Sequence, residues 1–432
     1  MRVCFAVARI ASCVLLLAGV TTRASAQDID GYVSVTGNVF PSIRLEGDEG
    51  HAVTELRTRV FVERRFEIAE RVRLTASGFA EGLVADRPQA SVIHAGIVRP
   101  QELHLEAAWQ KGDLRVGLSR VVWGRLDEFL PTDVVNPLDL ARFFFEGRSE
   151  GRLPVGMIRA RLLPSDRFTL EGIYVPFFRR GRFDQLDEDT SPFNLSPAFQ
   201  TVSHAPPRSW GNAQGGARAS VTTGRVDWSV SAYRGFESLP VYEVVTTQAI
   251  TATFHERFPR FTMIGADFET VRGPWGMRGE MAAFVDRTLQ VVESPALVKG
   301  KAIEAGLGVD RKAGGYRVSS NLILTKRWST LGLSLSPSVV DARPANLSID
   351  RTDLTLVGAI DRSFVRDTRS IRALAVYNPR EDSAFTRVIA TFSMRDNLSL
   401  ELSGGLFAGD GVDALSRLAS RDFLSARLKV FF

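Results

Sequence analysis

The chain has 432 residues, of which 54 are Lys or Arg and 49 are Asp or Glu, for a formal net charge of +5 and a mean hydropathy close to zero. This balance suits either a soluble protein of two or three domains or a closed β-barrel, and it gives no reason to expect nucleic acid as a partner. No run of 18 consecutive apolar residues occurs, which excludes helical membrane spans.

Residues 1–26 have the pattern of a secretory signal peptide: a basic residue at the start, a short apolar run and the small residues Ala24-Ser25-Ala26. Both cysteines lie in this segment, so a mature chain of residues 27–432 would have no disulfide and no thiolate metal site. Removing the segment also takes three of the 54 basic residues, which leaves 51 against 49 acidic ones, a net charge of +2. We expect cleavage near Ala26.

From residue 31 onward, apolar and polar residues alternate in segment after segment. In one of them Val226, Trp228 and Val230 alternate with Asp227 and Ser229. Side chains at i and i+2 share a face of a β-strand, so each segment predicts a strand with one apolar and one polar face. Eighteen strands are predicted, at residues 31–40, 55–63, 71–81, 102–109, 113–119, 156–163, 166–175, 214–222, 225–234, 261–270, 275–285, 301–310, 315–325, 352–360, 370–378, 385–394, 397–407 and 421–432.

The connections between these strands alternate between short and mostly long. Short ones, such as 110–112 and 223–224, contain residues typical of tight hairpins, whereas links such as 120–155 and 176–213 are far longer. Outer-membrane barrels have this asymmetry, with short turns at the periplasmic rim and long extracellular loops. We therefore predict an all-β fold, a transmembrane antiparallel β-barrel of 16–18 strands, with 18 the best count, in the outer membrane of a Gram-negative cell.

Aromatic residues lie at both edges of the apolar face. Trp228 and Tyr316 lie beside short turns, and Tyr174 and Tyr377 lie at the opposite ends of their strands. Such residues form the girdle of a barrel at the lipid–water interface. The last strand ends in Phe432, which resembles the C-terminal signal of outer-membrane barrels. The expected partners are therefore the barrel-assembly machinery, outer-membrane lipid and lipopolysaccharide.

A barrel of this width can enclose an aqueous lumen. The water-facing sides of the predicted strands carry many arginines, and rings of arginine in a pore favour anions. Acidic residues alternate with these arginines, so a second interpretation is that ion pairs stiffen the wall without any relation to a solute. The candidate pore-lining residues are Arg57, Arg59, Arg71, Arg73, Arg115, Arg159, Arg161 and Arg218.

The stretch Val121–Gly147, within the connection 120–155, interrupts the alternation. Asn136-Pro137 predicts a helix start with Asn136 as the N-cap, and the helix to about residue 145 would be apolar on nearly all sides. Such a helix must be packed, so we expect the loop to enter the barrel and narrow the pore, with its acids facing the arginines. The alternative is an extracellular loop that packs on itself or contacts another subunit. The candidate constriction residues are Asp127, Glu128, Asp133, Asn136 and Asp139.

The run GLSRVVWGRLDEFLPTDVVNPLDL contains W-G, then P-x-D, then N-P. This order resembles a motif in a family of Gram-negative outer-membrane proteins that is known as a domain of unknown function, and the match covers residues 117–161. The resemblance implies a porin-like channel and suggests hydrophobic or lipid-like compounds as one class of cargo. The wider architecture is also similar to the eighteen-stranded, arginine-lined alginate exporters.

We predict a porin-like channel for small solutes, anionic ones among them. The alternatives are an exporter of hydrophobic or polymeric compounds, a non-conducting surface adhesin and a barrel hydrolase. The sequence contains no G-x-S-x-G elbow, no Gly-rich phosphate loop and no His-x-x-x-His pair, so neither an enzyme nor a cofactor or metal is expected.

Overall fold

The structure is a computed structural model in which the placement of most of the chain is described. The signal peptide predicted over residues 1–26 lies outside the described part. No helix within that part is long and apolar enough to cross a membrane. The described residues are 29–46, 50–87, 92–195, 201–247, 251–290, 297–329 and 351–432.

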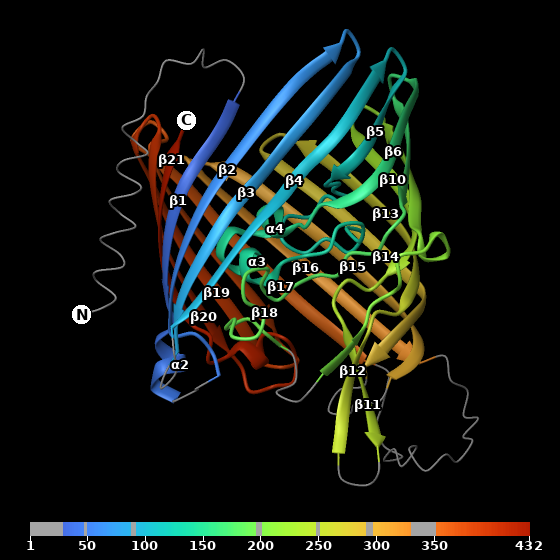
Figure 1. Ribbon diagram of the computed structural model, residues 1–432. Coiled ribbons are helices and arrows are strands. Elements are labelled where there is room, and N and C mark those ends of the chain that lie inside the picture. Colours follow the sequence, from blue (N-terminus) through green and yellow to red (C-terminus); the bar gives the residue numbers. More distant parts are fainter. Residues whose placement is uncertain are drawn as a thin grey trace.

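Eighteen strands form a closed antiparallel β-barrel, as predicted (Figure 1). At the closing seam, Gly31 and Phe432 exchange two backbone hydrogen bonds of 3.0 and 3.1 Å. A closed sheet leaves no strand edge unpaired, which lipid surroundings require. The barrel strands are β1 (Ile29–Val39), β2 (Thr54–Ala69), β3 (Val72–Asp86), β4 (Ile93–Trp109), β5 (Gly112–Ser119), β6 (Val155–Ser165), β7 (Phe168–Val175), β9 (Gln214–Thr222), β10 (Val226–Phe236), β13 (Arg260–Arg272), β14 (Trp275–Gln290), β15 (Leu297–Ala313), β16 (Tyr316–Ser329), β17 (Arg351–Phe364), β18 (Arg369–Asn378), β19 (Ser383–Arg395), β20 (Leu398–Ala408) and β21 (Phe423–Phe431).

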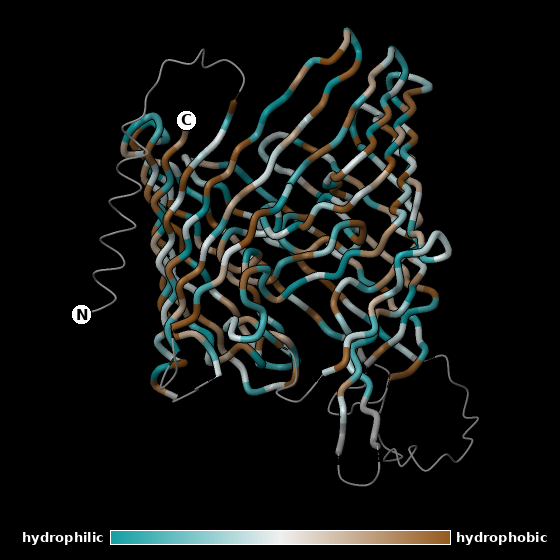
Figure 2. Tube along the Cα trace, viewed as in Figure 1, coloured by the Kyte–Doolittle hydropathy of each residue, from teal (hydrophilic) through white to brown (hydrophobic). Residues whose placement is uncertain are grey.

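Each of the eighteen predicted strands overlaps one barrel strand, and the alternation that predicted them sorts the side chains between lipid and lumen. On β10, Trp228 and Val230 are 51% and 60% exposed, whereas Ser229 and Ser231 are 3% and 6% exposed. Figure 2 shows hydrophobic and hydrophilic residues alternating along the barrel strands. The apolar face is the exposed one because it meets lipid, which reverses the arrangement of a soluble sheet.

The two rims of the barrel differ in their connections (Figure 1). One rim has short turns, such as residues 70–71 and 110–111, and the other has long segments such as 120–154 and 176–213. We call them the short-turn rim and the long-loop rim. By the rule for outer-membrane barrels, the short-turn rim faces the periplasm.

Three further strands were not predicted, because they lie in segments that we had assigned to loops. They form a separate sheet at the long-loop rim, where β12 pairs with both of the others. The short helix α2 (Pro41–Glu46) lies at the same rim (Figure 1). The other elements of the long segments are β8 (Thr201–His204), β11 (Val241–Thr247), β12 (Thr251–Arg257), η1 (Trp210–Asn212) and η2 (Ser416–Leu418).

The segment between β5 and β6, residues 120–154, runs through the inside of the barrel and is called the inner loop here. It carries the helices α3 (Leu140–Glu146) and α4 (Arg148–Gly151), which Figure 1 shows within the ring of strands. The predicted helix start was wrong by several residues. The N-cap of α3 is Asp139, whose side chain accepts a hydrogen bond from the Arg142 backbone N–H at 3.0 Å.

Candidate pore and its inner loop

Asn136 closes the inner loop on itself instead of capping a helix. Its Oδ1 accepts from the Val121 N–H at 2.7 Å, and its Nδ2 donates to the Leu153 carbonyl at 2.9 Å and to the Ser119 carbonyl at 3.3 Å. The two ends of the loop are thereby held together next to the strands from which they leave. Because all these groups are buried in the protein, each bond also satisfies a polar atom that water cannot reach.

Glu280 on β14 fixes the first turn of the inner loop to the wall. Its carboxylate accepts from the backbone N–H groups of Arg125 at 2.9 Å, Leu126 at 3.3 Å and Thr132 at 2.6 Å, and from the Thr132 hydroxyl at 2.7 Å. Gly124 has φ of +92°, and a Cβ there would lie 2.5 Å from the Glu280 carboxylate. A glycine is needed at this position by both the backbone conformation and the close approach.

Trp123, directly before this glycine, is an apolar anchor of the loop. It is buried, packs edge-on against Tyr233 with ring centroids 6.0 Å apart, and donates from Nε1 to Glu171 at 2.7 Å. Both partners lie on barrel strands, so the indole is held on its apolar body and on its polar tip.

Helix α3 packs on the wall through phenylalanines. Phe144 contacts the rings of Phe385 and Phe407 at centroid distances of 5.5 and 5.3 Å, and Phe145 contacts Phe423 at 5.1 Å. Phe193, from the segment between β7 and β8, stacks on Phe144 at 4.9 Å. These rings fill the lumen in front of β19–β21 and close that side to solutes.

Charged groups attach the other side of α3 to β2 and β3. Arg59 bonds Glu81 on β3 and Glu146 on α3, and Arg142 bonds the same Glu81. Burial raises the pKa of Glu146, but Arg59 and Arg427 outweigh it and hold that pKa well below its usual range. Glu146 therefore stays ionised, and it links α3 to both β2 and β21.

The candidate pore-lining arginines mostly have carboxylate partners across the strands or in the loops. Those on β2, β5 and β9 and Arg159 on β6 have side chains that are 9–20% exposed, whereas the Arg161 side chain is 39% exposed, and the pairing agrees with the interpretation that ion pairs stiffen the wall. The pairs are Arg57 with Glu55 and Asp184, Arg59 with Glu81 and Glu146, Arg115 with Glu106, Arg159 with Glu171, Arg161 with Asp113, and Arg218 with Asp267.

The remaining two candidates, Arg71 and Arg73, lie at the short-turn rim. Arg71 is in the β2–β3 turn and exposed, and Arg73 is exposed and pairs with Glu67 at 2.6 Å. Neither belongs to the narrow part of the lumen.

Only two of the predicted constriction acids reach arginines of the barrel wall. Asp127 bonds Arg278 on β14 at 2.9 Å, and Glu128 bonds Arg372 on β18 at 2.7 Å. Asp133 instead accepts from two arginines of the inner loop, Arg148 and Arg152, and Asp139 caps α3 and accepts from Gln185. Both are buried in the protein, so they stabilise the loop and do not face the lumen.

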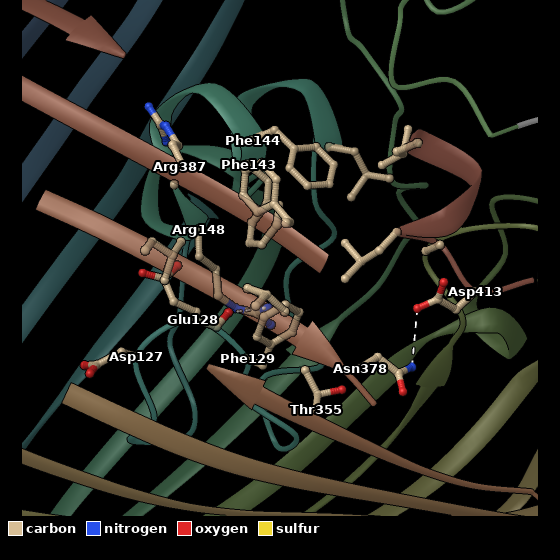
Figure 3. A pocket seen from close by; sticks show the side chains of 18 of the residues that line it. Asp127, Glu128, Phe129, Phe143, Phe144, Arg148, Thr355, Asn378, Arg387 and Asp413 are labelled. Carbon is tan, nitrogen blue, oxygen red and sulfur yellow. Dashed lines mark hydrogen bonds between the residues drawn. The ribbon is translucent and has the colours of Figure 1, made fainter. Parts of the chain in front are cut away.

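A cavity of about 840 Å³ lies between the inner loop and strands β16–β19. Its lining includes Arg317 and Arg327, which are ten positions apart on β16. At about 3.3 Å per residue this is roughly 33 Å along the strand, so the cavity follows the wall for most of its height. Figure 3 shows the loop residues Phe129 and Phe143 in this cavity, with the Asn378–Asp413 hydrogen bond near the long-loop rim.

Three arginines present their charge to this cavity. The side chains of Arg317, Arg327 and Arg372 are 36–40% exposed, whereas the carboxylates that pair with them are 11–32% exposed. The carboxylates of Asp127, Glu128, Asp353 and Asp361 also line the cavity, and each is less exposed than the cavity arginine that it pairs with. Arg327 was not identified from the sequence because it lies beyond the end predicted for its strand. Arg317 and Arg372 lie within the predicted strands 315–325 and 370–378, on the side that the alternation makes water-facing.

The cavity also has an apolar side. Phe129, Phe143 and Phe144 come from the inner loop, and Leu374 and Phe385 come from β18 and β19. Phe144 and Phe385 also anchor α3 on the wall, whereas Phe129, Phe143 and Leu374 are only partly buried and add apolar surface to the cavity, for which sequence alternation gives no signal. Within the described residues, no group of three or more His, Cys, Asp or Glu side chains is arranged to hold a metal ion.

Comparisons with known proteins place the chain among outer-membrane β-barrels. A family model described as "Protein of unknown function (DUF1302)" matches residues 101–360. OccK5 (OpdH) of Pseudomonas aeruginosa has a similar structure, with a TM-score of 0.51 and 10% identity over 94% of this chain and 97% of that chain. OccAB3 of Acinetobacter baumannii gives a TM-score of 0.50 and 11% identity over 94% and 99%. No match was found among curated proteins.

Proposed function

The chain belongs to the DUF1302 family of proteins of unknown function, and on that premise we propose that it is a porin-like channel of the outer membrane through which small solutes pass, anionic ones preferentially. The observation that carries the proposal is the cavity between the inner loop and β16–β19, because its lining extends along most of the wall. The inner loop then acts as the constriction, since it occupies the rest of the lumen.

The preference for anions follows from the exposure of the charges in this cavity. A guanidinium that is more exposed than its carboxylate partner offsets part of the cost of dehydrating a passing carboxylate or phosphate. Arg317 and Arg372 flank Asp361 in one row of paired residues, and Arg327 lies ten positions further along β16. An anion would therefore meet positive charge towards both ends of the cavity.

The apolar side of the cavity favours a second candidate function, the passage of amphipathic or hydrophobic compounds. Phe129 and Phe143 of the inner loop lie edge to face at 6.3 Å, and Leu374 adds an apolar side chain on the wall, two positions from Arg372 on β18. An organic anion with a hydrocarbon part could contact both sides at once, so the two candidates differ in the solute and share the path.

The test is single-channel conductance of the refolded protein in planar bilayers, with the reversal potential measured under a salt gradient. We expect open channels that prefer anions, and the variant R317Q/R327Q/R372Q should lose most of that preference. The matched control R272Q/R311Q/R369Q removes three arginines from the outer face of the barrel and should keep it. Absence of conductance at any voltage would overturn the channel, and an unchanged reversal potential in the lumen variant would overturn the anion preference.

The second candidate is tested by current block in the same bilayers. Octanoate should block the chloride current at lower concentration than acetate if the apolar side takes part in passage. Phe129→Ala should reduce this difference because it removes a ring from the apolar side. Equal block by the two carboxylates would show that only the charge matters.

A further inference from the structure

The outer face of β13–β18 carries a group of arginines at the short-turn rim. Trp275 on β14 is paired in the sheet with Arg272 on one side and Arg311 on the other, and Tyr316 is paired with Arg362. Directly paired residues of an antiparallel sheet point to the same face. Because Trp275 and Tyr316 are exposed on the lipid-facing side, their partners also lie on that side. Arg369, paired with Phe364, extends the group to β18.

Two of these arginines are stacked on the aromatic rings. The Arg311 guanidinium lies 4.9 Å from the Trp275 ring, and that of Arg362 lies 4.4 Å from Tyr316 and 4.6 Å from Phe364. Arg362 also donates a hydrogen bond to the Tyr316 hydroxyl. Stacking holds a guanidinium against the barrel surface at the depth of the aromatic girdle and leaves its outer N–H groups available for an anion.

Among the described residues, no carboxylate forms an ion pair with these arginines. In the described part of the chain, the acids of the same strand ends point into the lumen: Asp310 pairs with Arg278 and Arg317, and Asp361 pairs with Arg372. None of the ion pairs found among the described residues includes Arg272, Arg311, Arg362 or Arg369.

Trp228 and Trp109 at this rim have no such partners, and elsewhere on the outer face Arg64 stacks on Phe66 of β2. Trp228 on β10 is paired with Val221 and Phe268, and Trp109 on β4 is paired with Gly112. Aromatic girdle residues therefore occur without arginines as strand partners. The β13–β18 sector differs from the rest of this rim in grouping four arginines on neighbouring strands, and such a group favours an anionic ligand.

The position of the sector selects the kind of anion. One or two residues further along the same strands, Val309, Val318, Ile360 and Ile371 are exposed and belong to the lipid-facing apolar band. A ligand that reaches the arginines from this side has acyl chains on the band and an anionic group at the rim. We propose that the outer face of β13–β18 binds anionic phospholipids of the periplasmic leaflet, whose headgroup phosphates contact Arg272, Arg311, Arg362 and Arg369.

The test compares lipid retention by native mass spectrometry after release from nanodiscs of mixed phosphatidylglycerol and phosphatidylcholine. The wild type should retain phosphatidylglycerol preferentially. Each arginine at a membrane interface strengthens the association constant for anionic lipid roughly fivefold. The variant R272Q/R311Q/R369Q should therefore weaken retention by about a hundredfold if the three arginines act independently. Arg362 is left in place because it also packs on two rings.

The lumen variant R317Q/R327Q/R372Q is the matched control, since it removes the same charge from the inner face of the same wall. It should keep the lipid preference, and both variants should show the heat-modifiable electrophoretic migration of a folded barrel. Equal loss in both variants would overturn the site, as would equal retention of the two lipids by the wild type. The latter result would indicate that the arginines face an acidic partner protein instead.

Discussion

At the scale of single residues, Glu280 controls the inner loop because it is a wall carboxylate that accepts hydrogen bonds from backbone N–H groups. Glu280→Gln removes the charge and places an NH₂ group, itself a donor, beside these N–H donors. Loss of the charge-assisted hydrogen bonds should destabilise the first turn of the inner loop by about 2–3 kcal/mol. Amide hydrogen exchange at Leu126 and Thr132 should then accelerate by one to two orders of magnitude, as expected for that free energy. Glu106→Gln, which removes a lumen carboxylate paired with Arg115, should leave these two amides protected.

Asp139 gives the inner loop a pH dependence. Burial and the nearby Asp184 raise the pKa of Asp139 to about 6. In the unfolded chain the carboxyl titrates near pH 4, so between about pH 4 and 6 the folded protein binds the extra proton and its stability falls as pH rises. Acidification from pH 7 to 5 should therefore stabilise α3, by about 1.3 kcal/mol.

The check is hydrogen exchange of the α3 amides at both pH values, corrected for the intrinsic rates. Asn is as good an N-cap as Asp and carries no charge, so Asp139→Asn should keep the helix and remove the pH dependence. A dependence that persists in this variant would place its origin in another group.

At the scale of elements, the inner loop is the part that a deletion can test. Replacing residues 127–146 by a short Gly-Ser linker removes α3 and most of the material inside the barrel. Because an eighteen-stranded barrel without a plug is an open aqueous tube, conductance should rise by about twofold or more. Heat-modifiable migration would show that the barrel still folds. Conductance equal to that of the wild type would place the loop outside the conducting path.

The element scale also shows where local sequence rules fail. Asn136-Pro137 has the form of a helix start, yet the Asn136 side chain bonds the two loop ends and the helix begins after Asp139. Both residues are good N-caps, and only the tertiary partners of Asn136 decide between them. The sheet of β8, β11 and β12 was missed for a related reason. The antiparallel pair β11–β12 lies within the long segment between β10 and β13, and β8 joins it from another long segment, so none of the three belongs to the hairpin repeat of the barrel.

At the scale of the whole molecule, the barrel and its eighteen strands could be predicted because two independent periodicities agree. The alternation of side chains marks each strand, and the recurrence of short turns marks every second connection. The open side of the lumen could not be predicted. Arg57 and Arg317 have the same pattern in the sequence, but Phe145 of the inner loop and Asp184 of the segment between β7 and β8 cover the first, whereas the second lies beside the cavity. Where a loop folds depends on contacts that strand periodicity does not encode.

The charge of the whole lumen leads to a last prediction, which separates the two candidate functions. Electrostatic attraction by Arg317, Arg327 and Arg372 reaches about 10 Å in 0.1 M salt and about 3 Å in 1 M salt, so the anion preference should fall toward unity over this range. The reversal potential measures this change, and R317Q/R327Q/R372Q should vary little. Apolar contacts are not screened by salt, so block by octanoate should persist at 1 M if the phenylalanine side guides the solute. A constant anion preference together with lost block would contradict both assignments and place selectivity outside the cavity.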